Sequence, residues 1–97
     1  MKLLVRVTAE DIAEGRPRSG EYCPVALAFK RALAKEHILL KGVTISYLKA
    51  SYSAELDRCG YRIWESAQIN PRMRQWIKDF DKGLDVKPTH TTFVVSD

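Results

Sequence analysis

The side chains of this chain that could act as general bases or metal ligands are few and widely spaced. The chain has two histidines, His37 and His90, and two cysteines, Cys23 and Cys59. Zinc sites usually include a close pair of ligands, and none of these four residues forms one. Neither histidine lies in a catalytic motif, and the glycines are too scattered for a phosphate-binding or dinucleotide-binding loop. We therefore expect no enzyme activity, no metal and no cofactor.

Cys23 is the member of this set whose position suggests reactivity. It directly precedes a predicted helix, whose N-terminal dipole would lower the pKa of a thiol, and Arg16 and Arg18 are close in sequence. The alternative is a small apolar side chain at the point where a loop enters the core, because free cysteines are among the most buried residue types. We prefer the alternative. Nothing indicates an oxidising compartment, so both cysteines are expected to be thiols.

The charge is concentrated in one part of the chain. The net charge is +4, and residues 1–50 hold nine Lys and Arg against five Asp and Glu, whereas residues 51–97 hold seven of each kind. Between Arg16 and Lys49, seven basic residues face two acidic ones. Such a patch fits an acidic protein surface or the phosphates of a nucleic acid. The alternative is a helix face that is merely solvated by its charges.

A candidate partner surface lies within this basic region. The loop that begins at Arg16 lacks periodicity and adjoins a predicted helix over residues 24–35, on which Leu27 lies near the charged side. Leu27 is either a singly exposed leucine or the apolar anchor of an interface. The predicted partner-binding residues are Arg16, Arg18, Leu27, Lys30, Arg31 and Lys35.

Short helices and strands would position this surface. Alternating apolar residues predict strands over residues 2–7, 43–49, 61–64 and from Thr91 onward, and helical periodicity predicts helices over residues 9–14, 24–35 and 71–82. Thr8 and Asn70 are natural N-caps, and Gly15 and Gly83 mark helix ends. The Lys41-Gly42 step reads as a bend, a bulge or a tight turn, and residues 50–58 as an ambiguous stretch with room for a helical turn.

The order of these elements predicts one α+β domain over residues 1–97, with a small antiparallel or mixed sheet of three to five strands and two main helices packed on one face. The expected core brings together Trp76, Ile77, Phe80, Val25, Phe29, Leu33, Val5, Ile45 and Phe93. The apolar run before Arg6 is too short for a signal peptide, and no stretch is long enough to cross a bilayer. A soluble, cytoplasmic protein without membrane contact is expected, and a homodimer is left open.

Two segments carry a resemblance. The run Val-Thr-Ala-Glu-Asp-Ile-Ala-Glu-Gly that begins at Val7, followed by Cys-Pro-Val-Ala-Leu-Ala from Cys23, resembles short uncharacterised proteins of phage and prophage genomes. The helix from Met73 to Phe80 and the closing strand at Thr91 look similar as well. The resemblance implies a small accessory protein of the kind that binds and inhibits a host factor, CRISPR and other defence systems included. It assigns no functional residue, since the shared residues are explained as caps and turns.

The sequence thus favours binding over catalysis. The first expectation is a phage-type accessory protein that binds a host or phage protein, in the host cytoplasm, as an inhibitor of a defence system. The second is a nucleic-acid-binding protein that uses the basic patch of residues 16–49. The third is a protein that sequesters a small ligand.

Overall fold

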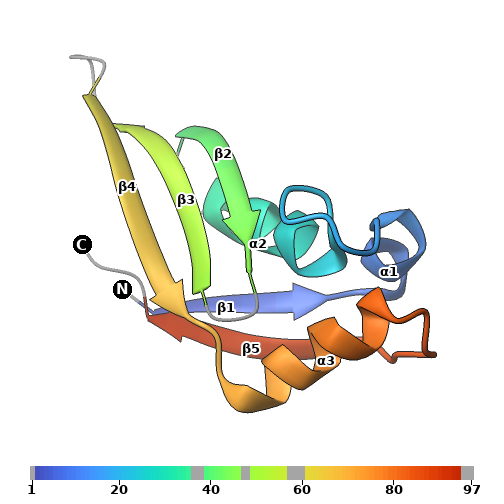
Figure 1. Cartoon of the computed structure of the whole chain (residues 1–97). Coiled ribbons are helices and arrows are strands. Elements are labelled where there is room, and N and C mark those ends of the chain that lie inside the picture. Colours follow the sequence, from blue (N-terminus) through green and yellow to red (C-terminus); the bar gives the residue numbers. More distant parts are fainter. Residues whose placement is uncertain (1, 36–38, 47–48, 57–60, 95–97) are drawn as a thin grey trace.

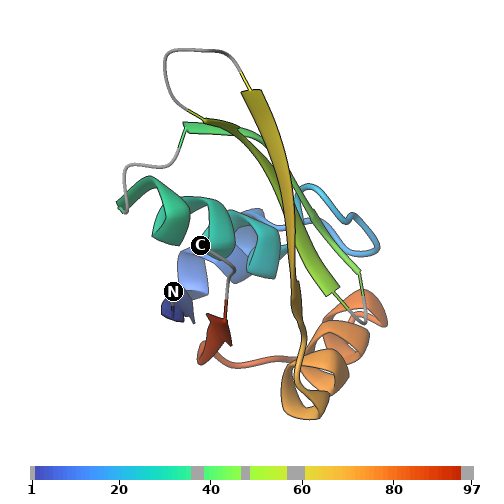
Figure 2. The same ribbon diagram turned by 90° about the vertical axis from the view of Figure 1, so that its left-hand side faces the viewer.

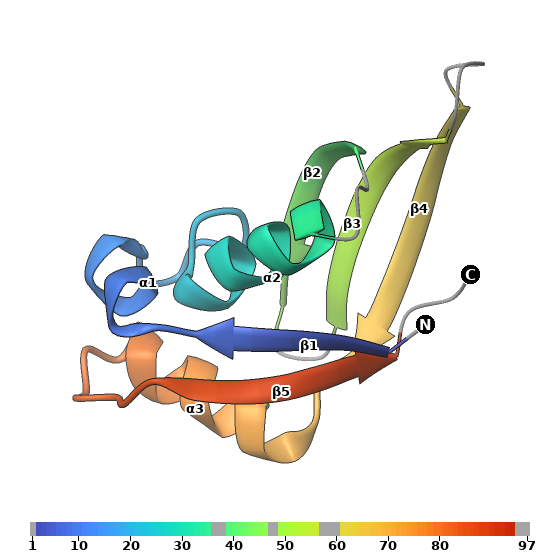
Figure 3. The same cartoon turned by 180° about the vertical axis from the view of Figure 1, so that it is seen from behind.

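The alternation of apolar and polar residues at both ends of the chain builds one two-stranded ribbon. In the computed structural model, which describes residues 2–35, 39–46, 49–56 and 61–94, β1 (Lys2–Val7) pairs antiparallel with β5 (Thr89–Val94). Leu3 lies opposite Phe93, and Arg6 lies opposite His90. Leu3, Val5, Val7, Thr91 and Phe93 are buried on the inner face of the ribbon, so its outer face is left to the alternate, exposed residues. Figure 3 shows the two strands side by side.

Three further strands form a second antiparallel sheet. β2 (Leu39–Ile45), β3 (Lys49–Leu56) and β4 (Tyr61–Gln68) follow one another along the chain and across the sheet. The pairing register of β2 shifts between Leu40 and Gly42, so the Lys41-Gly42 step is an irregularity within one strand and not a turn. Figure 1 shows this sheet standing crosswise to the ribbon.

Helix α2 (Pro24–Lys35) joins the two sheets. Val25, Phe29 and Leu33 are fully buried, and the ring of Phe29 meets that of Phe93 edge to face, with centroids 5.1 Å apart and an interplanar angle of 85°. Helix α2 lies against one face of the three-stranded sheet, and α3 (Pro71–Asp81) follows directly from β4 (Figure 2). The core is therefore enclosed by the ribbon, the second sheet and these two helices.

The short helix α1 (Ala9–Glu14) begins and ends as its sequence predicts. The hydroxyl of Thr8 accepts the backbone N–H of Asp11 (3.2 Å), and the Asp11 carboxylate accepts the backbone N–H of Thr8 (2.9 Å), which completes a capping box. At the other end, a Cβ atom on Gly15 would lie 2.5 Å from the ring of Pro24. Glycine at position 15 thus lets the chain pass closely over the start of α2.

The ends of α3 also follow the prediction. The side-chain oxygen of Asn70 accepts the N–H of Met73 (2.9 Å), and its amide group donates to the hydroxyl of Thr91 (2.8 Å). After the helix, Gly83 has a φ of 81°, and the N–H groups of Gly83 and Leu84 donate to the carbonyls of Phe80 and Asp79. These two bonds satisfy the last carbonyls as a Schellman motif does.

Replacing Asn70 by alanine is expected to destabilise the protein by about 1 to 2 kcal/mol, because it removes an N-cap and a partner of the buried Thr91 hydroxyl. Thermal unfolding followed by circular dichroism measures the effect. Asn70→Asp is the matched control, since it keeps an oxygen that can accept the N–H of Met73. Equal melting temperatures for Asn70→Ala and the unchanged protein would contradict this role of Asn70.

The α+β class, the antiparallel sheet and the two main helices are confirmed, with two differences. First, the five strands are divided between two sheets. Second, residues 50–56 are strand without a helical turn, β2 ends at Ile45, and β4 continues to Gln68. Both differences come from pairing between neighbouring strands, which outweighs local propensity. Residues 36–38 and 57–60 lie outside the described part of the chain.

The expected core is confirmed except on α3. Met73 and Ile77 are the buried residues of this helix, while Trp76 and Phe80 are half-buried and stack on each other, with centroids 6.0 Å apart. The Trp76 indole N–H donates to the carbonyl of Lys87 (2.9 Å), which keeps the ring at the rim. The predicted burial of Trp76 and Phe80 is therefore wrong. Among the described residues, no helix has the length and apolar character needed to cross a membrane.

Candidate functional site

The loop between α1 and α2 is held in place by backbone hydrogen bonds. The N–H of Arg16 donates to the carbonyl of Tyr22 (2.9 Å), and the N–H of Ile45 in β2 donates to the carbonyl of Gly20 (2.7 Å). The N–H of Arg18 donates to the carboxylate of Asp81 in α3 (2.8 Å). The loop thus forms hydrogen bonds within itself, to β2 and to α3.

An exposed aromatic ring with two cations lies at the end of this loop. Tyr22 is 49% exposed, the guanidinium of Arg16 lies 5.4 Å from its ring centroid, and the Lys30 ammonium lies 4.9 Å from it. The Lys30 ammonium also donates to the carbonyl of Glu21 (2.9 Å). We call Arg16, Tyr22 and Lys30 the Tyr22 cluster. Cation–π contacts at exposed sites contribute about 0.5 to 1 kcal/mol each, so they hold the three side chains together.

The other predicted partner-binding residues are distributed along the loop and α2. Arg18 sits at the loop's tip with a φ of 57° and lines a hollow of about 260 Å³ together with Ile77 and Asp81. Leu27 is half-buried, so it is neither a freely exposed leucine nor a core residue. Lys35 is exposed at the far end of α2. Arg18 and Lys35 thus line different depressions of the surface.

Arg31 has a structural role that the sequence analysis did not foresee. Its guanidinium donates to both carboxylate oxygens of Asp11, at 2.9 and 2.7 Å, and to the backbone carbonyl of Arg6 at 2.8 Å. The Asp11 side chain is 5% exposed and that of Arg31 43%. Arg31 thus neutralises a buried charge and joins α2 to α1 and β1. Its assignment as a partner-binding residue stays a prediction, because the Arg31 side chain is also 43% exposed.

The surroundings of Asp11 shift its pKa in opposing directions. Burial raises the pKa of the carboxyl group, but the hydrogen bonds and charge of Arg31, together with the hydrogen bonds of Thr8, lower it by more. The net result is a pKa below the ordinary value. Asp11 is therefore ionised in the folded protein at neutral pH.

Arg31 and Lys35 line a groove between α2 and β1. Lys2 and Arg6 line the opposite wall, the small residues Ala28 and Ala32 belong to the α2 wall, and the groove has a volume of about 430 Å³. The sequence analysis missed Lys2 and Arg6. Their alternation with the buried residues of β1 is the signal that could have placed them on the outside of the strand.

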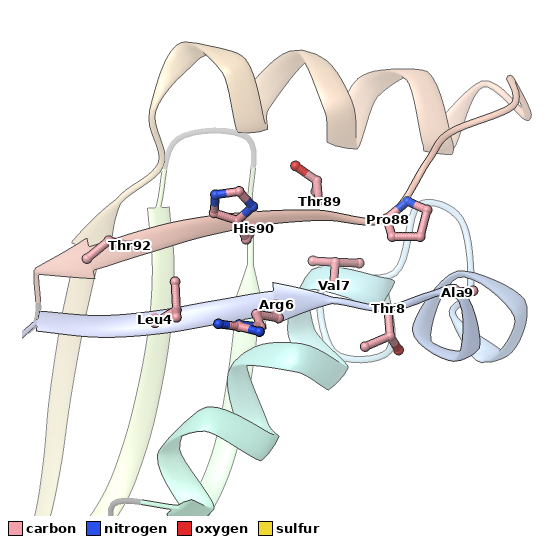
Figure 4. Close-up of a pocket in the computed structure, with 9 residues that line it drawn as sticks. All are labelled: Leu4, Arg6, Val7, Thr8, Ala9, Pro88, Thr89, His90 and Thr92. Carbon is pink, nitrogen blue, oxygen red and sulfur yellow. The ribbon is translucent and has the colours of Figure 1, made fainter.

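A second, open hollow of about 840 Å³ covers the outer face of the ribbon (Figure 4). Leu4 and Arg6 of β1 line it from one side, and His90 and Thr92 of β5 from the other. Because Leu4 and Arg6 also line the groove, the two depressions adjoin across β1. His90, one of the two candidate general bases, thus lies on an exposed strand face with no carboxylate or cysteine among the described residues around the hollow.

Cys23 is a buried residue at the start of α2. It is 3% exposed, and its sulfur accepts the backbone N–H of Ala26 at 3.4 Å, so it helps to cap the helix. Burial raises the pKa of the Cys23 thiol, and the nearby carboxylate of Asp81 raises it further. The structure therefore favours a packing role over a reactive thiol. Within the described ranges, no three His, Cys, Asp or Glu side chains are grouped as metal ligands.

Two surfaces of the described chain thus combine charge with a fixed shape, the Tyr22 cluster and the groove between β1 and α2. No family model, curated protein or solved structure matches this chain.

Proposed function

We propose that this protein is a small accessory factor that binds another protein through the Tyr22 cluster, and that the partner presents an acidic surface there. The observation that carries the proposal is the half-exposed Tyr22 ring, which is in contact with two cations. The Arg16 guanidinium comes from the loop and the Lys30 ammonium from α2. The ring and the two cations together offer apolar area and positive charge at one place on the surface, which suits a partner that presents apolar and acidic groups.

The composition of the cluster matches the centre of a protein interface. Tyr and Arg are among the residues that contribute most to binding energy in interfaces, because they combine a large contact area with hydrogen-bonding or charged groups. Hydrogen bonds of Arg16 and Gly20 fix the loop before any partner arrives, and the Lys30 ammonium is fixed by Glu21. Little conformational entropy would then be lost on binding, which favours affinity.

Charge supports the choice of an acidic partner. The cluster has two cations, and Arg18 lies on the same loop. Positive charge at the edge of an interface accelerates association with a negative surface, and the effect falls with added salt. The resemblance to phage accessory proteins supports a narrower form of the proposal, in which the partner is a host factor such as a component of a defence system and is inhibited when bound.

The test compares Tyr22→Ala with Leu84→Ala, which removes a large, 56% exposed side chain elsewhere on the surface. Each tagged protein is used for affinity capture from a bacterial lysate with quantitative mass spectrometry, and the affinity for any captured protein is then measured. We expect Tyr22→Ala to weaken binding at least tenfold, as loss of a central aromatic residue does, while stability falls by no more than the about 1 to 2 kcal/mol that the two cation–π contacts contribute. Leu84→Ala should bind normally.

A second experiment tests how the positive charge of the cluster affects binding. Arg16→Gln with Lys30→Gln should slow association and reduce its dependence on salt, because fewer positive charges attract the partner. Full affinity of Tyr22→Ala for the captured protein would contradict the proposal. An equal loss of affinity for the captured protein in Leu84→Ala and Tyr22→Ala would contradict it as well.

A further inference from the structure

Cationic side chains line the groove between β1 and α2 from both walls. Lys2 and Arg6 are four residues apart on the same face of β1, which spaces their Cα atoms by about 13 Å. Arg31 and Lys35 are four residues apart on α2, about 6 Å along its axis. Ala28 and Ala32 belong to the α2 wall, and their small side chains leave room for a ligand. The groove therefore points positive charge inward from two directions.

No negative charge offsets these cations among the described lining residues. The residues that line the groove and the adjoining hollow include no Asp or Glu. Asp11 lies close by, but its carboxylate is buried and bonded to Arg31. Arg31 is thus largely neutralised, while Lys2, Arg6 and Lys35 contribute about three unneutralised charges.

The adjoining outer face of the ribbon offers a flatter, partly apolar surface. Leu4 is 47% exposed there, and His90 and Thr92 lie across from it on β5 (Figure 4). An imidazole ring is a surface on which an unstacked base can stack, an aliphatic side chain adds apolar contact, and a threonine hydroxyl can bond to a base edge or a sugar. A charged groove beside such a surface is the combination that proteins use for single strands.

We propose that this groove and the outer face of the ribbon bind single-stranded nucleic acid, with the phosphate chain between Lys2, Arg6 and Lys35 and bases against Leu4 and His90. Cations on two facing walls can contact one phosphate chain at the same time. A duplex instead presents two phosphate chains, which a major groove about 12 Å wide separates. The site shares no lining residue with the Tyr22 cluster, so this proposal stands independently of the protein-binding function.

The test measures fluorescence anisotropy of labelled oligothymidylate and oligouridylate with the full chain at several salt concentrations. Binding should weaken with salt with a logarithmic slope of about −2, which is about 0.7 for each of three phosphate contacts. Lys2→Gln, Arg6→Gln and Lys35→Gln combined should reduce affinity at least tenfold and flatten the slope. The comparison of the two oligonucleotides distinguishes DNA from RNA.

The matched control removes three positive charges that do not line the groove, with Arg18→Gln, Lys82→Gln and Lys87→Gln combined. We expect this variant, and Tyr22→Ala, to bind the oligonucleotides as the unchanged protein does. An equal loss of oligonucleotide affinity in this control variant would mean that only the net charge matters, and it would overturn the proposal. Tighter binding of a duplex, equally tight binding of a polyglutamate peptide, or no binding of either oligonucleotide would also overturn it.

Discussion

Replacing Phe29 by alanine is expected to remove most of the free energy that stabilises the folded protein. Phe29 is fully buried in α2, where its ring packs edge to face on Phe93 of β5. Deleting such a ring costs about 3 to 5 kcal/mol, because apolar surface is lost and the cavity closes only in part. Domains are stable by about 5 to 15 kcal/mol, and one of this size lies near the lower end. The variant should melt at least about 12 °C lower.

Two controls on the same helix separate packing from helix propensity. Leu27→Ala removes a half-buried side chain and should cost about 1 kcal/mol. Phe29→Leu keeps part of the side-chain volume, so its loss of stability should lie between those of Leu27→Ala and Phe29→Ala. Thermal and urea unfolding measure all three variants. A Phe29→Ala protein that melts within about 3 °C of the unchanged protein would contradict the placement of α2 between the two sheets.

Elements whose signals are local could be predicted from the sequence. Thr8 and Asn70 accept N–H bonds from residues three positions later, and Pro24 and Pro71 suit the first turn of a helix, so the beginnings of all three helices were predicted correctly. The buried faces of β1 and α2 follow from their periodicity. Each of these features depends on residues that are only a few positions apart in the sequence.

Features that depend on distant parts of the chain could not be predicted in this way. The ribbon joins the two ends of the chain, so its separation from the other sheet depends on contacts about 90 residues apart. The ion pair of Asp11 with Arg31 and the approach of Arg16 to Tyr22 depend on how the loop folds back. Charge counts alone placed Arg31 in a partner surface, because a buried carboxylate cannot be recognised from sequence spacing.

The two open edges of the ribbon show how arginines complete the fold. Arg6 and His90 are partners in the register of β1 and β5. The Arg31 guanidinium from α2 donates to the carbonyl of Arg6, and the Arg72 guanidinium from α3 donates to that of His90. Each helix thus covers one edge of a narrow sheet that would otherwise expose backbone groups to another chain. Basic residues on both helices serve the fold in addition to any ligand.

Replacing Arg31 by alanine is expected to destabilise the protein by about 2 to 3 kcal/mol at neutral pH. The cost comes mainly from Asp11, whose buried carboxylate would lose its partner. We place the value below that of a fully buried pair because solvent screens the 43% exposed Arg31 side chain. Lys35→Ala, on the same helix, removes an exposed charge without such bonds and should change stability by less than about 0.5 kcal/mol.

The effect should depend on pH in a direction fixed by Asp11. Its pKa is lowered in the folded protein, so the ion pair contributes stability above the ordinary carboxyl pKa of about 4, and this contribution is lost as the pH falls through the lower, folded value. In Arg31→Ala, burial remains while the favourable partner is gone, so Asp11 is protonated at higher pH and the cost of its charge disappears. The stability difference between the two proteins should therefore narrow from pH 7 to pH 3, as urea unfolding would show.

A difference that stays constant over this range would mean that Arg31 acts through packing or through the Arg6 carbonyl. A double-mutant cycle with Asp11→Asn separates these contributions, with a coupling energy near zero as the outcome against the ion pair.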